Sequence, residues 1–195
     1  MSSRDDILSK LRSAGRVPEP LPEVPLFDAG LPPALDQFKT TLARMGGQWL
    51  DTPAEGLDAW LGTRFPDAKV ICSAVPEMAG TLRVETVTDP RALENVDVGI
   101  VRARFAVAET GSVWLSEAEY GVNSLGYLAQ HLVVLLDASA ILPNLHHAYR
   151  QPAFAEARYC ALVTGPSATA DIEGVLIRGA QGVRTLTVVG LGQRV

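Results

Sequence analysis

The sequence is poor in cysteine: 195 residues include two, and no Cys-x-x-Cys pair. A structural zinc or an iron–sulfur cluster held by cysteines needs clustered thiolates, so this chain by itself can hold neither. Cys72 and Cys160 each lie in an apolar, strand-like run, which is typical of buried thiols. Any cluster-based electron transfer must therefore belong to another protein.

Long apolar runs and an excess of basic charge are also missing. No stretch reaches the roughly 18 unbroken apolar residues of a membrane span, and the start "MSSRDDILSKLRSAG" has no apolar core of a secretion signal. The 17 basic side chains are scattered and are outnumbered by 22 acidic ones, which argues against a nucleic-acid surface. We therefore predict a cytoplasmic protein that binds neither membranes nor nucleic acid.

The histidines do not suggest a metal site. His146 and His147 are adjacent on a predicted helix, where neighbouring side chains point about 100° apart. His131 stands alone before a strand. We therefore predict no metal, and nothing in the sequence names a cofactor.

The chain divides by composition into an arm and a domain. Residues 1–33 begin with an amphipathic helix, "SSRDDILSKLRSAG", and continue with six prolines between positions 18 and 33, which forbid a helix and indicate an extended arm. Residues 34–195 are rich in apolar runs and predict one α/β domain, with helices over about 34–45 and in "AEGLDAWLGTRF".

The last third of the chain has the clearest pattern. It predicts strands over 131–136, 158–164 and 185–191, with helices over about 141–150 and 168–179 between them. Such a β-α-β-α-β unit connects into a mainly parallel sheet covered on both faces. Ligands of open sheets of this kind bind at the carboxyl ends of the strands.

The stretch "TGPSATADIEG" follows one of these strands and is unusually rich in polar side chains. In a binding loop, hydroxyls and helix N-terminal amides would converge on a ligand oxygen, and glycine would permit close approach. In a purely structural interpretation, the serine caps a helix that begins here, and the acidic side chains interact favourably with the positive end of the helix dipole. The candidate residues are Gly165, Pro166, Ser167, Thr169, Asp171 and Glu173, with Asp171 as a candidate for proton transfer.

A second candidate is the turn Glu109-Thr110-Gly111, between the strand-like "FAVA" and "SVWLS". Glu109 could act as a general base or nucleophile, with Thr110 and Gly111 binding the ligand. The same three residues also suit an ordinary surface hairpin turn.

Four stretches resemble the LUD-domain family, of the lactate-utilisation protein C type, in the order that the family has them. They are "SRDDILSKLR", "GIVRARFAVAETGSVWLS", "HLVVLLDASAILPNLHHAY" and "TGPSATADIEGVLIRGAQGVRTLTVVGLG". The resemblance implies a three-layer α/β fold like that of the NagB/RpiA/CoA-transferase group. It also implies a place beside two iron–sulfur proteins that oxidise L-lactate to pyruvate.

One position departs from the family pattern. An arginine is common where this chain has Ala168, and an arginine could grip a carboxylate. Arg102, Arg104 and Arg178 are the residues that could replace it if the fold brings one close.

Three functional hypotheses follow. The first is an accessory subunit or small-ligand-binding protein in L-lactate utilisation, with iron–sulfur proteins as partners. The second is a free-standing enzyme of the same fold group, which resembles CoA transferases, sugar-phosphate isomerases and formyltetrahydrofolate cyclo-ligases. The third is a structural homo-oligomer in which the Pro-rich arm wraps a neighbour.

Overall fold

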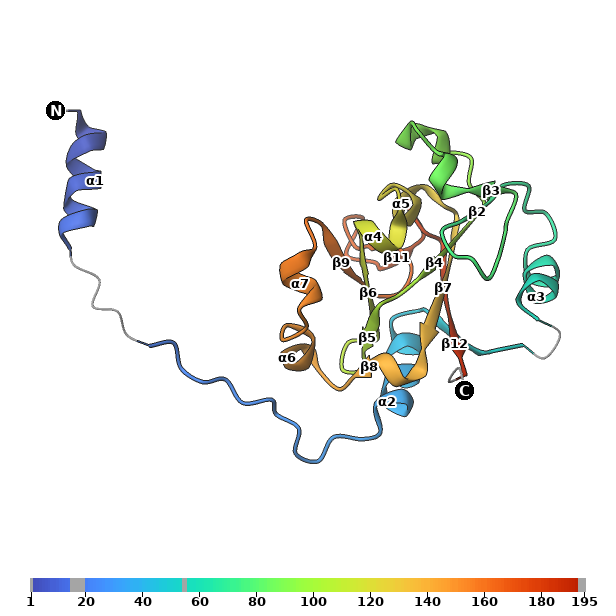
Figure 1. The fold of residues 1–195 in the computed structure, drawn as a ribbon, viewed down its shortest axis with the longest axis horizontal. Coiled ribbons are helices and arrows are strands. Elements are labelled where there is room, and N and C mark those ends of the chain that lie inside the picture. The colour runs from blue at the N-terminus through green and yellow to red at the C-terminus, as the bar shows by residue number, and fades with distance from the viewer. Residues whose placement is uncertain (1, 15–19, 54–55, 193–195) are drawn as a thin grey trace.

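The computed structural model describes residues 2–14, 20–53 and 56–192 of the chain. Its α-helices are α1 (Ser3–Ser13), α2 (Ala34–Arg44), α3 (Leu57–Arg64), α4 (Glu117–Tyr120), α5 (Leu125–Leu128), α6 (Leu145–Ala148) and α7 (Ala153–Glu156). Its strands are β1 (Gln48–Asp51), β2 (Ile71–Ser73), β3 (Leu82–Arg83), β4 (Val98–Arg102), β5 (Phe105–Val107), β6 (Ser112–Ser116), β7 (His131–Asp137), β8 (Ile141–Leu142), β9 (Cys160–Val163), β10 (Ala168–Thr169), β11 (Ile177–Arg178) and β12 (Thr185–Leu191). Figure 1 shows their arrangement.

The centre of the molecule is a parallel sheet with the strand order β1-β12-β7-β4-β2-β3. The long strands β7 and β12 pair along their whole length, from His131 opposite Thr185 to Asp137 opposite Leu191. Helix α3 packs on one face of this sheet through Leu61, together with Phe65, the residue that follows the helix. The predicted α/β class, with a mainly parallel sheet and three-layer character, is confirmed.

The other face of the parallel sheet is covered by a smaller sheet with the order β8-β5-β6-β9. The chain enters it directly from the central strands: β4 leads into β5, and β7 leads into β8. Helices α6 and α7 cover its far face, where Phe105 and Trp114 stack with their ring centroids 5.3 Å apart.

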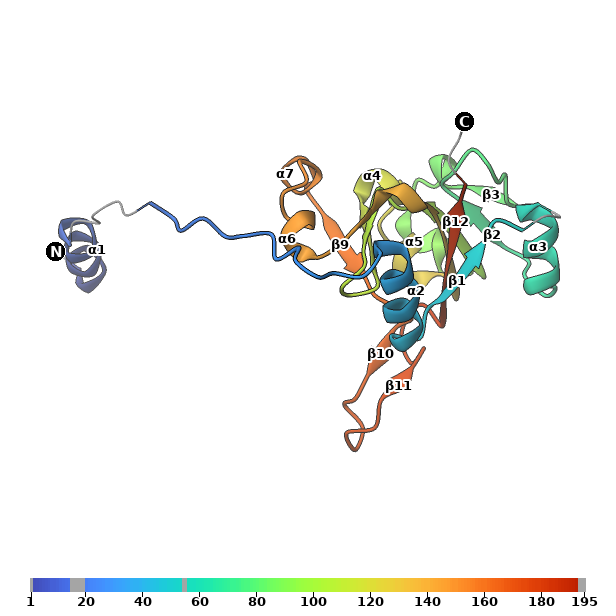
Figure 2. The ribbon, with the colours of Figure 1, turned by 90° about the horizontal axis from the view of Figure 1, so that it is seen from below.

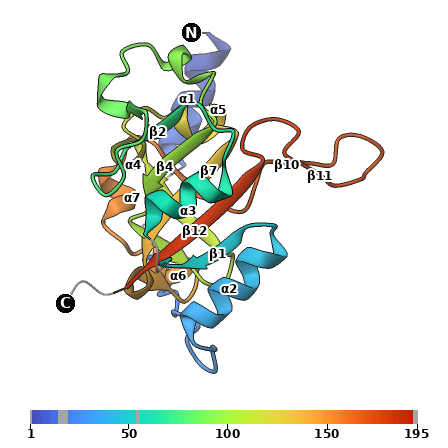
Figure 3. The same ribbon diagram turned by 90° about the vertical axis from the view of Figure 1, so that its right-hand side faces the viewer.

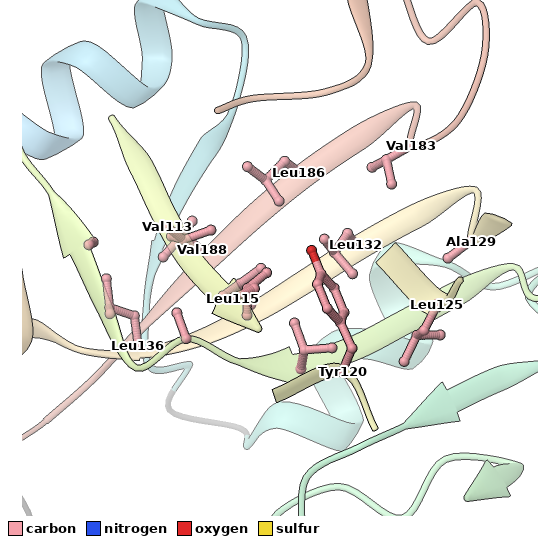
Figure 4. Packing of buried hydrophobic residues seen from close by; sticks show 14 of the residues in the cluster. Val113, Leu115, Tyr120, Leu125, Ala129, Leu132, Leu136, Val183, Leu186 and Val188 are labelled. Atoms are coloured by element: carbon pink, nitrogen blue, oxygen red, sulfur yellow. The ribbon is translucent and has the colours of Figure 1, made fainter. Parts of the chain in front are cut away.

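Successive side chains along the central strands alternate between the two faces of the parallel sheet, and both faces are buried. In β7, Leu132 and Leu136 point to the small sheet, while Val133 and Leu135 point to α3. Figure 4 shows Leu132 and Leu136 beside residues of β6 and β12 in the core between the two sheets. Burying side chains on both faces requires the continuous apolar runs that the sequence has.

The first helices agree with their sequence signals. Ser2 caps α1 in a capping box with Asp5, and Gly15, which the sequence favours as the end of this helix, lies outside the described residues. Helix α2 buries Phe38 and Leu42 and ends just before Gly46, as predicted. The arm also contacts the domain: the side chain of Asn144, the residue before α6, donates a hydrogen bond to the Leu26 carbonyl (2.7 Å).

The predicted helix over about 168–179 is wrong. The segment is a hairpin, in which β10 and β11 pair antiparallel and Ala168 lies opposite Arg178. The amide of Val175 donates to the carbonyl of Ile172 (3.1 Å) across Glu173 and Gly174, which have φ angles of 56° and 69°. Positive φ at both central positions is the mark of the type I′ turns that close tight hairpins. Figures 2 and 3 show the hairpin standing out from the body of the molecule.

The β-α-β-α-β prediction for the last third is partly wrong. Strands β7 and β12 are neighbours in the parallel sheet, but β9 lies in the small sheet and pairs antiparallel with β6. The predicted helix over about 141–150 is shortened to α6, because Ile141 and Leu142 form β8 beside β5. A buried strand and a buried helix segment have the same short apolar pattern.

Candidate functional site

The fold brings the two predicted loops to one edge of the small sheet. Val113 of β6 lies opposite Val163 of β9, so the turn before β6 and the loop after β9 are neighbours. The Ser112 hydroxyl donates to the Thr110 hydroxyl (2.8 Å) and lies 2.5 Å from the Thr164 hydroxyl. A chain of three hydroxyls thus connects the Glu109-Thr110-Gly111 turn to the start of the Gly165 loop.

Gly111 and Gly165 both permit the close approach of α2. A Cβ atom on Gly111 would lie 2.5 Å from the amide nitrogen of Leu42, and one on Gly165 would lie 2.4 Å from the carbonyl oxygen of Met45. Both residues also have positive φ angles, 68° and 69°. The described contacts therefore give these glycines a packing role against the C-terminal half of α2.

Glu109 is exposed and is not among the residues that line the cavity beside the Gly165 loop. Its carboxylate accepts a hydrogen bond from the amide of Leu145 (3.0 Å), the first residue of α6. A carboxylate at a helix N-terminus satisfies a free amide and is favoured by the helix dipole. This contact gives Glu109 a structural task that the sequence did not predict.

A cavity of about 300 Å³ lies beside the Gly165 loop. The stretch 164–192, "TGPSATADIEGVLIRGAQGVRTLTVVGLG", is called the signature-like stretch below. We call the cavity the signature cavity, because residues 164–167 and 181–183 of this stretch line it together. Its other lining residues are Gly126, Tyr127, Ala161, Leu162 and Val163. It thus contains the predicted Gly165, Pro166 and Ser167, and none of its lining residues is charged.

Polar groups at the signature cavity are largely engaged with one another. The Ser167 hydroxyl donates to the Gln181 carbonyl and closes the base of the hairpin. The hydroxyls of Tyr127 and Tyr159 are hydrogen-bonded to each other. Gln181 could have been noticed in the signature-like stretch, but no local signal marked Tyr127, which comes from the distant α5.

Tyr120 stands behind this cavity. Its hydroxyl is fully buried and has no hydrogen-bond partner among the described residues, and Gly126 of the cavity wall lies against its ring. Burial raises the pKa of the Tyr120 hydroxyl well above its ordinary value. Figure 4 shows the hydroxyl pointing toward the side of the core where Val183 and Leu186 lie. Tyr120 therefore remains a neutral donor near the cavity wall.

The remaining predicted residues lie on the hairpin. Thr169 is half-buried, and its hydroxyl accepts from the amide of Asp171 (3.3 Å). Asp171 and Glu173 are exposed, on the part of the hairpin beyond β10. The structure thus separates these two carboxylates from the residues that line the signature cavity.

The carboxyl ends of β2 and β4 hold a second cavity, of about 350 Å³, whose wall includes Arg102 and Arg104. Arg102 pairs with Glu77 (2.6 Å), and Arg104 pairs with Glu119 (2.9 Å). Sequence reasoning missed both acids, because Glu77 comes from the loop after β2 and Glu119 from α4, both distant in sequence from their arginines. Since each arginine is already neutralised, this edge is poorly suited to hold an anion without breaking an ion pair.

Of the three arginines considered as replacements, Arg178 is the one that lies across the hairpin from Ala168. Its guanidinium donates to the carbonyl of Arg44 (3.3 Å), at the end of α2, and lies beside Gly46. Positive charge at a helix C-terminus is stabilising. Arg178 therefore stabilises the same C-terminal end of α2 that Gly165 packs against.

The described residues contain no group of three or more side chains able to hold a metal ion. Cys72 is buried in the parallel sheet, and burial raises its pKa to about 11, whereas Cys160 is half-buried in the small sheet. In the ranges that the structure covers, no helix has the length and apolar character needed to span a membrane.

Comparison with known proteins agrees with this architecture. The chain is similar to lactate utilization protein C of Deinococcus radiodurans, with 25% identity over 92% of this chain and 90% of that protein. It is also 35% identical over 95 residues to the uncharacterized protein YkgG of Escherichia coli K12, a match that spans 46% of this chain and 41% of YkgG.

A solved structure has the same fold. The crystal structure of a DUF162 family protein from Deinococcus radiodurans superposes with a TM-score of 0.60 at 18% identity, over 82% of this chain and 96% of that one. The LUD domain model matches residues 22–190, which include nearly all of both main sheets and all but the last two residues of the signature-like stretch. This chain therefore belongs to the LUD-domain family.

Proposed function

We propose that this protein takes part in lactate utilisation as an accessory protein that binds a small ligand in the signature cavity. The relative that aligns over 92% of the chain carries the name lactate utilization protein C, at 25% identity. The observation that carries the proposal is that the two halves of the signature-like stretch, residues 164–167 and 181–183, line one cavity of about 300 Å³. Ligand pockets commonly begin at about this size.

The character of the cavity limits the ligand. Its wall has hydroxyl, amide and backbone groups but no charged side chain. A bare carboxylate buried there would lose its hydration without gaining a cation, which is costly. The ligand should therefore enter through hydroxyl, carbonyl or apolar groups, and any charge it carries should stay outside.

An accessory role fits the cysteine chemistry of the chain. Cys72 and Cys160 lie in different sheets, so they form neither a redox pair nor half of a cluster site. Electrons from lactate would need another carrier, and iron–sulfur proteins are the partners that we expect. The free-standing enzyme is less favoured, because Glu109 is not among the residues that line the signature cavity and its Oε2 atom accepts the Leu145 amide.

The partner part of the proposal is tested by isolation from the native host. We would purify the tagged protein from cells grown on L-lactate and from cells grown on glucose, identify its partners by mass spectrometry, and assay lactate oxidation in the eluate. Cysteine-rich iron–sulfur proteins together with activity, enriched on lactate, are the expected result. A protein that comes down alone and inactive from lactate-grown cells under gentle conditions would argue against a subunit.

The cavity part is tested by filling the cavity. Ala161→Trp places a large side chain on its wall, whereas Ala155→Trp adds the same bulk to the exposed α7. In a deletion strain, we expect the first variant to fail to restore growth on L-lactate and the second to restore it, with both proteins folded by circular dichroism. Normal growth with a folded Ala161→Trp protein would show that the cavity is not used.

A further inference from the structure

The N-terminal helix α1 has an apolar face that no other described part of the chain covers. Ile7, Leu8 and Leu11 are spaced to lie on one side of this helix, and Ile7 (58%) and Leu11 (68%) are largely exposed. None of the 11 residues of α1 is buried. Isolated helices shorter than about 12–15 residues are only marginally stable in water. We therefore expect α1 to be stabilised by packing its apolar face on another surface.

The apolar face of α1 also carries positive charge. Arg4 and Arg12 lie four residues before and four residues after Leu8, so both are its neighbours on the helix surface. Among the residues that the structure describes, neither arginine forms an ion pair, whereas Lys10 pairs with Asp6 (2.9 Å). The face thus combines apolar side chains with two unpaired guanidinium groups.

The hairpin of β10 and β11 has the complementary character. It stands out from the body of the molecule (Figures 2 and 3) and, within six consecutive residues, exposes four large apolar side chains: Ile172, Val175, Leu176 and Ile177. Asp171 and Glu173 flank Ile172, are exposed, and form no ion pair in the described ranges. Exposed apolar groups rimmed by polar residues are typical of protein–protein contacts. The hairpin therefore offers apolar contacts beside two unpaired carboxylates.

The arm that follows α1 in the sequence is held on the side of the domain where α6 lies. The Arg150 guanidinium donates to the Val24 carbonyl (2.8 Å), and Nε2 of His147 lies 2.7 Å from the Asp28 carboxylate. From these contacts the arm leads away from the body and not back over the hairpin (Figures 1 and 2). This direction favours delivery of α1 to a neighbouring molecule over a contact with its own hairpin.

We propose that α1 of one copy of this chain packs on the hairpin of a second copy, and that the exchange is reciprocal. Ile7, Leu8 and Leu11 would cover the apolar side chains of the hairpin, while Arg4 and Arg12 meet its two carboxylates. Reciprocal exchange of one element closes at two copies, so the product is a two-fold dimer. The proposal is independent of the ligand site, because none of residues 171–177 lines the signature cavity.

The experiment reverses the charges on each side of the contact in the full-length chain. The helix variant carries Arg4→Glu and Arg12→Glu, and the hairpin variant carries Asp171→Lys and Glu173→Lys. In either variant alone, like charges face each other across both contacts, so dimerisation should weaken about 10-fold or more. In a mixture of the two variants, opposite charges face each other at both contacts, and a dimer should form again. Sedimentation velocity measures the mass of each sample.

Two controls separate the contact from general effects of charge and folding. Asp67→Lys with Glu94→Lys makes the same change of charge at exposed positions away from the hairpin and should dimerise as the wild type does. Val175→Ser with Leu176→Ser removes apolar contacts without changing charge. This last variant should weaken the dimer and keep the circular dichroism spectrum of the folded chain, because both side chains are exposed.

Three results would overturn the proposal. The first is a wild-type chain that stays monomeric at about 100 µM, because interfaces of ordinary size have dissociation constants from micromolar to picomolar; an α1 that folds back on its own hairpin would give this result. The second is a dimer that neither charge reversal weakens, which would place the interface elsewhere. The third is a mixture of the helix and hairpin variants that remains monomeric, which would show that these charges do not meet across two copies.

Discussion

The contact between Gly165 and α2 allows a sharp test of what this glycine does. Gly165 and Gly174 have the same φ angle, 69°, and both belong to the signature-like stretch. A Cβ atom on Gly165 would lie 2.4 Å from the Met45 carbonyl oxygen, whereas one on Gly174 would have nothing within 4 Å. Replacing each by alanine therefore imposes the same backbone strain but a different steric cost.

The two costs can be estimated. An L-residue in the left-handed region costs about 1–2 kcal/mol, and the restricted unfolded chain returns about 0.4–1 kcal/mol, so Gly174→Ala should cost about 1 kcal/mol. Gly165→Ala adds the displacement of a packed helix end, and overpacking of this kind typically costs about 1–3 kcal/mol. We expect a total of about 2–4 kcal/mol for Gly165→Ala.

The assay is urea unfolding at 25 °C, followed by circular dichroism, with the slope compared between variants to confirm that the transition is unchanged in kind. A difference of at least 1 kcal/mol between the two variants is the expected result. Equal losses would refute the reasoning, because they would mean that α2 moves aside freely and that Gly165 is needed only for its backbone conformation.

Three further predictions concern packing, capping and pH. Leu42→Ala should lower the free energy of unfolding by about 2–5 kcal/mol in the same urea assay, since Leu42 is fully buried. Met45→Ala, on the exposed side of the same helix end, should cost far less. Similar losses in the two variants would contradict the packing described for α2. Glu109→Ala should lower the free energy of unfolding by about 1 kcal/mol, and Glu109→Gln should lower it by less, because glutamine keeps an acceptor for the Leu145 amide. Thermal unfolding measures both losses, and equal losses would argue against capping of α6 by Glu109. Between pH 7 and pH 5 the free energy of unfolding should fall, because burial lowers the pKa of His131 in the folded protein below its ordinary 6.5, so the unfolded chain takes up the proton first. His131→Asn should flatten this dependence when unfolding is measured across the pH range. An unchanged slope would exclude His131 as the cause.

The candidate site shows what sequence reasoning can reach. The position of Gly165, Pro166 and Ser167 after a strand predicts a binding loop, and these residues line a cavity in the structure. Tyr127 could not be selected, because α5 reaches the cavity from a distant part of the chain. Glu109 was selected for its apolar flanks, but the Leu145 amide that it meets is brought there by β8, which no local pattern predicted.

The hairpin shows where local signals compete. Pro166 and the acids after it favour a helix start, whereas Glu173-Gly174 between Ile172 and Val175 favours a hairpin turn. The exposed fractions of Ile172 (61%) and Val175 (59%) show that no core face decided between them. Pairing of β10 with β11, with Arg178 anchored at the end of α2, is the outcome that the tertiary structure stabilises.

The sequence by itself determined the α/β class, the strands β7 and β12, and the first helices, because continuous apolar runs and helix caps are local patterns. The tertiary structure alone decided that β9 joins a second sheet, that β8 exists, and that His131 of β7 lies against Thr185 of β12. The physical reason is that strand pairing joins backbone groups far apart in the sequence. An apolar run states that a strand will be buried, but it carries no information about which partner will bury it.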